Sequence, residues 1–295
     1  MAWTLGEDLE TFREAAGALL AHRPDRHTVL LSVTHQLASL GTDLYGTEPP
    51  VFGWWREPGG RVTGACLRTP PHPVTLSVMP GEAAAALPAA LADGSRAANG
   101  PGHRGGPGAS PPDVHGPARV VEAYTSAVAA RTGSRMVQRR RERLYRLHTL
   151  RPPRPAPPGR ARPATTEDRP LLVEWSAAFR REIGHGTAGS SRALDARIAE
   201  GRMMLWEDGA GPVAMAGSSP VVAGTVRIGP VYTPAEHRGR GYAAAATAAE
   251  TRVRLDADVD EVLLFADLAN ATSNGLYRRL GYVPVDDYLA AALPG

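Results

Sequence analysis

Two glycines lie between a strand-like and a helix-like segment in the C-terminal half of the chain, in the run Arg238-Gly239-Arg240-Gly241. Residues 226–233 are rich in β-branched side chains and predict a strand, whereas the alanine-rich residues 242–254 predict a helix. Glycine permits a tight turn, and the first backbone N–H groups of a helix have no partner inside it. The segment therefore predicts an anion site suited to a phosphate or pyrophosphate.

A second interpretation of this segment is a tight turn that carries two solvated arginines. Arg238 and Arg240 favour the phosphate site, because the guanidinium group suits phosphate. The run is not the phosphate loop of NTPases, since no Gly-Lys-Ser/Thr follows it, and it lacks the third glycine and the acidic residue of the dinucleotide fingerprint. The turn by itself leaves both interpretations open.

A second motif, Asn270-Ala-Thr-Ser-Asn-Gly-Leu-Tyr-Arg-Arg-Leu-Gly-Tyr282, follows the glycine turn. It resembles the Asn-x-x-Ser-Asn-x-x-Tyr-x-x-x-Gly-Phe/Tyr signature of the GNAT N-acetyltransferases. The Arg-x-x-Gly-x-Ala run after Val-Tyr-Thr-Pro resembles the acyl-CoA loop of the same family. The resemblance covers about Arg162 to Tyr288. It implies an α/β (α+β) fold with a mixed, mostly antiparallel sheet flanked by helices.

The resemblance implies acetyl-CoA as co-substrate. Its pantetheine arm is expected to pair with the backbone of the strand before the turn, its pyrophosphate to rest on the amides of the turn, and Asn270 to bond a pantetheine amide. Ser273 is also a candidate helix N-cap. The residues expected to bind the co-substrate are Val231, Tyr232, Thr233, Arg238, Gly239, Arg240, Gly241, Tyr242, Ala243, Asn270, Ser273 and Asn274.

Tyr277 and Asp267 are the candidate catalytic residues. The resemblance implies that the Tyr277 phenol protonates the leaving thiolate, and that a strand amide such as that of Val231 stabilises the oxyanion. Without the motif, Tyr277 would be interpreted as a core tyrosine. The general base stays undetermined, because Asp267 also suits a hydrogen bond to the turn after it. Weaker candidates are Glu174, Glu182, His185 and His237, and an amine of low pKa needs no base.

The segment 151–164 holds six prolines and predicts a semi-rigid linker between two domains. The N-terminal half, 1–150, repeats the order of elements of 165–295 but has no Arg-x-x-Gly-x-Gly/Ala after its strand at 74–79. We therefore expect tandem GNAT-like domains, a degenerate one without a phosphate loop at 1–150 and a catalytic one at 165–295.

Three local predictions concern the ends of the chain and its largest loop. Residues 5–20 predict a first helix, and 93–117 predict a flexible loop. That loop contains His103–Gly108, a superficial copy of a phosphate loop in which Pro107 removes a donor. The short tail 289–295 predicts a clipped last strand.

Charge and composition narrow the classes of partner. The net charge of the 295 residues is +3, and no basic stripe alternates with aromatics, so we expect no nucleic-acid partner. No apolar run of membrane-spanning length and no basic N-terminal leader occur, so we expect a cytoplasmic protein without a membrane partner, either monomer or homodimer. Cys66 predicts a buried small hydrophobe, and no metal-ligand cluster stands out.

The expected activity is transfer of acetyl from acetyl-CoA to a primary amine of a small molecule, directly in a ternary complex. Candidate acceptors are an amino acid, a polyamine, an antibiotic or a natural-product intermediate. Two alternatives stay open: a peptide or protein N-acetyltransferase, and a non-catalytic acyl-CoA sensor or interaction protein.

Overall fold

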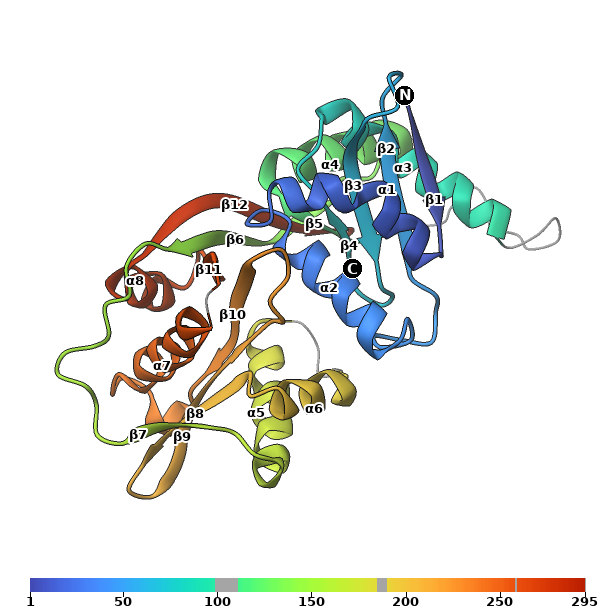
Figure 1. Ribbon diagram of the computed structural model, residues 1–295. Helices are drawn as coiled ribbons and strands as arrows, with labels where there is room; N and C mark the ends of the chain where they lie inside the picture. Colours follow the sequence, from blue (N-terminus) through green and yellow to red (C-terminus); the bar gives the residue numbers. More distant parts are fainter. Residues whose placement is uncertain (99–110, 185–189, 258, 295) are drawn as a thin grey trace. The chain divides into compact units, whose positions relative to one another are not determined.

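The computed structural model describes residues 1–98, 111–184, 190–257 and 259–294. The chain divides into two compact units (Figure 1). Unit 1 comprises residues 1–142 and 286–295, and unit 2 comprises residues 143–285.

The described part of unit 1 is a mostly antiparallel sheet with four helices. Its strands follow the order β1-β2-β3-β4-β5 and then the end of β12, and only the pairing of β4 with β5 is recorded as parallel among its described strands. The elements are β1 (Ala2–Gly6), α1 (Leu9–His22), α2 (Thr28–Leu40), β2 (Val51–Arg56), β3 (Val62–Arg68), β4 (Val74–Leu76), α3 (Gly81–Ala98), β5 (Val114–Pro117) and α4 (Ala118–Thr132).

The helices of unit 1 cover both faces of its sheet. Alternate side chains of β2 point to opposite faces, so Phe52 stacks on Phe12 of α1 while Trp55 joins the core under α3 and α4. Cys66 is also buried in that core, and burial raises the pKa of its thiol. A thiolate nucleophile is therefore not available there.

Unit 2 has the same plan with a longer parallel pair. The strand order is β12-β6-β11-β10-β9-β8-β7, and β10 pairs with β11 in parallel. Its elements are β6 (Val137–Leu147), β7 (Arg160–Pro163), α5 (Arg169–Glu182), α6 (Ser191–Ala199), β8 (Met203–Asp208), β9 (Gly211–Ser218), β10 (Thr225–Tyr232), α7 (Tyr242–Asp256), β11 (Glu261–Asp267), α8 (Ala271–Arg279) and β12 (Tyr282–Ala292).

The two faces of the unit 2 sheet carry separate cores. On one face, α5 and α6 bury Leu172, Trp175 and Ile198 against Leu205 and Met215. On the other face lie α7 and α8 (Figure 1). They cover buried residues such as Trp206, Ala216, Val226 and Leu264. The alternation of inward side chains along β8 and β9 predicts this division, because neighbouring strand residues point to opposite faces.

Two strands belong to both units. Strand β6 enters unit 2 at residue 143, and β12 leaves it after residue 285 to pair with β5, from Tyr288↔Pro117 to Ala291↔Val114. The last strand is therefore not clipped, contrary to the expectation from the short tail. The division at 142/143 and 285/286 also differs from the expected domains at 1–150 and 165–295, because strand pairing and not proline content sets the boundary.

Two local expectations differ from the structure, and a third falls on residues that it does not describe. The first helix begins at Leu9 and not at residue 5, because residues 2–6 pair with β2, and Asp8 caps the helix by accepting a hydrogen bond from the Thr11 amide at 2.7 Å. Residues 114–117 of the expected loop form β5. His103–Gly108 lies outside the described residues.

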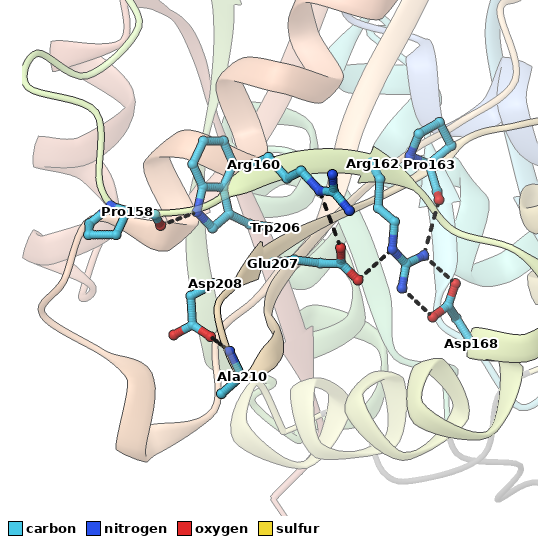
Figure 2. A network of polar contacts seen from close by, with 9 residues as sticks. All are labelled: Pro158, Arg160, Arg162, Pro163, Asp168, Trp206, Glu207, Asp208 and Ala210. Carbon is cyan, nitrogen blue, oxygen red and sulfur yellow. Dashed lines mark hydrogen bonds and ion pairs between the residues drawn. The ribbon is translucent and has the colours of Figure 1, made fainter.

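The expected linker is part of the unit 2 sheet. Residues 160–163 form its edge strand, β7, which pairs antiparallel with β8. Figure 2 shows the polar network that holds this strand: Arg162 donates to Glu207 at 2.5 Å and to both carboxylate oxygens of Asp168 at 2.6 and 2.8 Å. The hydrogen bonds from Arg162 lower the pKa of Asp168 to about 2. The proline-rich composition predicted extended backbone but could not show that this backbone pairs with a strand.

A buried imidazole joins three segments of unit 1. His27 Nδ1 lies 3.1 Å from the carbonyl oxygen of Leu20, and Nε2 accepts a hydrogen bond from the Val78 amide at 3.2 Å. A carbonyl only accepts and an amide only donates, so these partners require the neutral ring with its proton on Nδ1. Burial, the largest cause, lowers the pKa of His27 from its usual 6.5.

The two contacts of the buried His27 ring predict a pH dependence of stability. The pKa is lower in the folded than in the unfolded state, so its stabilising contribution is present above pH 6.5 and lost as the pH falls through the folded-state pKa. We expect the urea-unfolding midpoint of the full chain to fall between pH 7.5 and pH 5.5, and to fall less in His27→Gln. His22→Gln, at an exposed histidine, is the control. An equal pH dependence in His27→Gln and wild type would contradict this role.

Candidate acyl-transfer site

A gap in strand pairing opens the edge between β10 and β11. The two strands pair in parallel from Thr225↔Glu261 to Ile228↔Leu264, and the pairing stops there although β10 runs to Tyr232. Pro230 has no amide hydrogen, and the register of β10 against β9 shifts between Ile228 and Val231. The strands therefore separate beside residues 229–232, where an extended ligand can pair with their backbone.

The connection from β10 to α7 has a backbone conformation that requires glycine at two positions. A short 3-10 helix (Ala235–His237) follows Pro234, and then Gly239 and Gly241 adopt left-handed φ values of 75° and 83°. A Cβ at Gly239 would meet no atom within 4 Å, so backbone conformation and not crowding selects glycine there. Gly241 is the N-cap of α7, and no side chain caps this helix end. The first amides of α7 therefore have no partner inside the helix and can accept an anion at the positive end of the helix dipole.

Arg238 is exposed but contacts several residues of its own chain. Its guanidinium donates to the carbonyl oxygen of Thr233 at 2.9 Å and to Glu182 of α5 at 2.6 Å, and it lies 5.9 Å from the centre of the Tyr232 ring. Tyr232 in turn packs on Trp175 of α5, with ring centres 6.1 Å apart. Arg238 therefore ties the turn to α5, a contact that the expected phosphate role did not include.

The other two side chains of the turn differ from each other. Arg240 is exposed, as a phosphate-contacting arginine must be. The Tyr242 ring is buried and its hydroxyl donates a hydrogen bond to Asp208 at 3.3 Å. Only the backbone amide of Tyr242, and not its phenol, is therefore left to contact a ligand at the turn.

The start of α8 forms the other wall of the gap. Asn270 caps the helix, because its side-chain oxygen accepts a hydrogen bond from the Ser273 amide at 2.9 Å. The helix cap is therefore Asn270, and the interpretation of Ser273 as the cap is wrong. Both residues are partly or fully accessible at the end of β11, where Asn270 was expected to meet the co-substrate.

Asn274 holds three elements together. Its side-chain nitrogen donates to the carbonyl oxygens of Asp267 and Asn270 at 2.7 and 2.8 Å, and its oxygen accepts a hydrogen bond from the Tyr145 hydroxyl of β6 at 2.7 Å. The residue is buried. These contacts assign Asn274 to the support of the site rather than to its lining, which the motif alone could not show because Tyr145 lies far away in the sequence.

Tyr277 lies one turn after Asn274 in an apolar environment. It is buried among Val226, Ile228 and Leu264 and contacts Tyr282 with ring centres 6.2 Å apart. Burial raises the pKa of Tyr277 to about 12, so the phenol keeps its proton at neutral pH. Within the part of the chain that the structure describes, its hydroxyl forms no hydrogen bond. A neutral phenol in this state can donate a proton to a bound partner.

The structure favours the turn role of Asp267 over the base role. Its side chain accepts a hydrogen bond from the Ala269 amide at 2.8 Å, and its carbonyl oxygen accepts one from the Asn270 amide at 3.0 Å. Of the weaker candidates, Glu182 is paired with Arg238 and Glu174 is exposed. His185 lies outside the described residues.

The structure brings the two motifs to one edge of the unit 2 sheet. The turn follows β10 and α8 follows β11, which are parallel neighbours, so both motifs lie at the carboxyl ends of adjacent strands. Sequence reasoning missed Glu182 and Tyr145 as supports of this edge. A tyrosine in a strand rich in arginine gave only a weak signal that its hydroxyl would meet α8.

No group of three or more His, Cys, Asp or Glu side chains that could hold a metal occurs in the described ranges. In the same ranges, no helix combines the length and the apolar character needed to cross a membrane.

The support role of Asn274 predicts a loss of stability. Asn274→Ala removes three buried hydrogen bonds and leaves the Tyr145 hydroxyl without its acceptor, so we expect unfolding to require about 2–4 kcal/mol less free energy. Ser273→Ala, at the neighbouring position, should change the free energy by less than about 0.5 kcal/mol. Urea unfolding of both variants tests this, and equal values would contradict the support role.

The family model described as "Acetyltransferase (GNAT) family" matches residues 167–282. Among curated proteins, none matches this sequence.

Solved structures resemble the chain over almost its whole length. A GCN5-related N-acetyltransferase from Sphaerobacter thermophilus is 21% identical, with 99% of this chain and 96% of that chain covered and a TM-score of 0.60. A Drosophila protein is 13% identical, with 99% and 98% covered and a TM-score of 0.66. A tandem GNAT protein from the clavulanic acid biosynthesis pathway is 14% identical, with 100% and 99% covered and a TM-score of 0.58. At these identities the likeness concerns the fold, which is the two-domain, mixed-sheet arrangement of tandem GNAT proteins.

Proposed function

We propose that the chain is an N-acetyltransferase that transfers acetyl from acetyl-CoA to a primary amine of a small molecule, because residues 167–282 match the GNAT acetyltransferase family model. The observation that carries this proposal is the end of the β10–β11 pairing at Ile228 and Leu264, next to the left-handed glycines that open α7. The gap suits an amide-bearing arm, and the uncapped helix end suits a pyrophosphate. Acetyl-CoA contains both groups.

In this proposal the chain binds and orients the co-substrate along one edge of unit 2. The backbone of Val231, Tyr232 and Thr233 pairs with the pantetheine arm, and the amides from Gly239 to Ala243 hold the pyrophosphate. Arg240 adds charge to that site, while Arg238 keeps the turn against α5 through Glu182. Asn270 and Ser273 meet the arm from the α8 side. Acetyl-CoA supplies the acetyl group as a thioester.

The proposed proton donor is Tyr277. Its raised pKa of about 12 keeps the phenol protonated, so it can deliver a proton to the sulfur as the C–S bond breaks. The amine attacks directly in a ternary complex, since the buried Cys66 offers no nucleophile for a covalent route. We retain the amide of Val231 as the proposed oxyanion donor, and Asp267 as a proposed base only if its turn hydrogen bond opens.

The proposed acceptor is a small amine. The classes to screen are amino acids, polyamines, antibiotics and natural-product intermediates. One structural neighbour comes from the clavulanic acid biosynthesis pathway, which supports the inclusion of natural-product intermediates in that screen.

The co-substrate site is tested by binding of acetyl-CoA. We expect wild type to bind with a micromolar Kd, and the double variant Gly239→Val/Gly241→Val to lose at least about a hundredfold in affinity, because β-branched residues do not adopt the left-handed φ values of the turn. Isothermal titration measures both. Gly209→Val, at a glycine with open space and no left-handed φ, is the control and should bind like wild type. Absence of binding by wild type would overturn the proposal.

The role of Tyr277 is tested by Tyr277→Phe. Loss of the donor should lower kcat by about tenfold to a thousandfold and leave the Kd of acetyl-CoA within about twofold of wild type. Tyr282→Phe is the matched control, because Tyr282 packs on Tyr277 but its hydroxyl is paired with Thr251 at 2.7 Å. Unchanged turnover in Tyr277→Phe would remove Tyr277 from the mechanism. Binding of acetyl-CoA by wild type without turnover of any amine would favour the sensor.

A further inference from the structure

The segment 148–159, here called the arch, crosses the outer side of α7 within unit 2. Its first end is held beside α8, where the His148 amide donates to the carbonyl oxygen of Gly281 at 3.0 Å and the Arg151 amide to that of Leu280 at 2.9 Å. A Cβ at Gly281 would lie 1.9 Å from the carbonyl oxygen of Thr149, so this close approach requires glycine.

The second end of the arch is held at β8. The Trp206 indole donates to the carbonyl oxygen of Pro158 at 3.0 Å, as Figure 2 shows. A Cβ at Gly159 would lie 2.0 Å from the carbonyl oxygen of Glu207, which again requires glycine. The ion pairs of Arg160 and Arg162 with Glu207 continue this anchor into β7. The arch is therefore tied to the end of α8 at one end and to the sheet at the other.

An apolar cavity of about 230 Å³ lies between the arch and α7. Pro152, Pro153 and Ala156 line it from the arch and Trp206 from β8. The side chains of α7 that line it recur on one helix face, at Ala245, Ala248, Ala249 and Arg252. The three alanines leave the space open, because their side chains end at Cβ. The cavity is open to solvent, and its volume exceeds the volume of about 150 Å³ that holds benzene in another protein, so a single aromatic ring fits in it.

One of the residues that line the cavity is charged. Arg252 is exposed, and among the lining residues, all of them described, it alone carries a charge. No ion pair of Arg252 occurs in the described part of the chain. The ligand that complements an apolar cavity with a guanidinium at its opening has an apolar body and one anionic group.

We propose that the cavity between the arch and α7 binds a small aromatic or branched-chain monocarboxylate, with its apolar body against Trp206 and the alanines and its carboxylate on Arg252. The site lies on the flank of α7, whereas the proposed pyrophosphate site lies at the N-terminus of that helix. Pro157 of the arch lies close to Gly241, but the two sites use different groups, so they are proposed to be occupied independently, and the cavity site does not depend on the proposed acetyl transfer.

The test uses 4-bromobenzoate as the probe. We expect isothermal titration of the full chain to give saturable binding with a Kd on the order of 1 mM or tighter. Soaked crystals should show the anomalous signal of bromine between residues 152–156 and α7. Absence of saturable binding, or bromine located elsewhere, would overturn the proposal.

Two variants test the two halves of the site. Ala249→Leu fills the cavity and should abolish binding, whereas Ala257→Leu, at an exposed alanine after the helix, should not. Arg252→Gln should weaken binding by about threefold to tenfold, and Arg278→Gln, at an exposed arginine of α8, should leave it unchanged. Thermal melts show whether each variant is folded. Equal binding by wild type and Ala249→Leu, if both are folded, would place the probe outside the cavity.

Two further measurements separate other ligand chemistries. The neutral 4-bromobenzamide should bind more weakly than the acid, and equal affinity would contradict the role of Arg252. Saturating acetyl-CoA should leave binding of 4-bromobenzoate unchanged. Displacement by acetyl-CoA would assign the cavity to the nucleotide and overturn the proposal. A chain that binds the probe but not acetyl-CoA would keep this site and reject the proposed transferase.

Discussion

The end of the ladder between β10 and β11 is the constraint on which the arrangement of unit 2 depends. Parallel pairing stops at Ile228↔Leu264, and Pro230 cannot donate the next hydrogen bond. Backbone groups that a ladder leaves without a strand partner need another partner, and an extended ligand can supply one. The left-handed glycines then direct the chain into α7, so the open end of a helix lies next to the open edge of a sheet.

The open edge needs support from distant parts of the chain. Asn274 ties α8 to the end of β11 and accepts a hydrogen bond from Tyr145 of β6, a residue 129 positions earlier. On the other side, Arg238 ties the turn to Glu182 of α5. These contacts are polar and directional, so they hold one geometry of the backbone, which apolar packing alone specifies less well. The supporting residues form hydrogen bonds with one another and with nearby backbone carbonyls. The backbone groups that are proposed to bind the ligand therefore stay available for it.

The two units resemble each other in plan and differ at the corresponding edge. Both place a parallel pair after an antiparallel run, β4 with β5 and β10 with β11. In unit 1 the connection after β4 is short, and the Val78 amide is used by His27. A Cβ at Gly116 of β5 would lie 2.9 Å from Leu76, so the two strands remain close there. The absence of acyl-CoA binding by unit 1 stays a prediction, and this packing supports it.

Most local elements of unit 2 and the two motifs of the candidate site could be predicted from the amino-acid sequence. Glycine φ preference, β-branched runs and alanine-rich helices act over a few residues, so Gly239, Gly241 and the α8 motif were recognisable. Only the folded chain shows that residues 160–163 join a sheet, that β12 returns to unit 1, and that Arg238 and Asn274 form hydrogen bonds with other residues of the chain. These outcomes depend on which distant donor meets which acceptor, and no local pattern encodes that pairing.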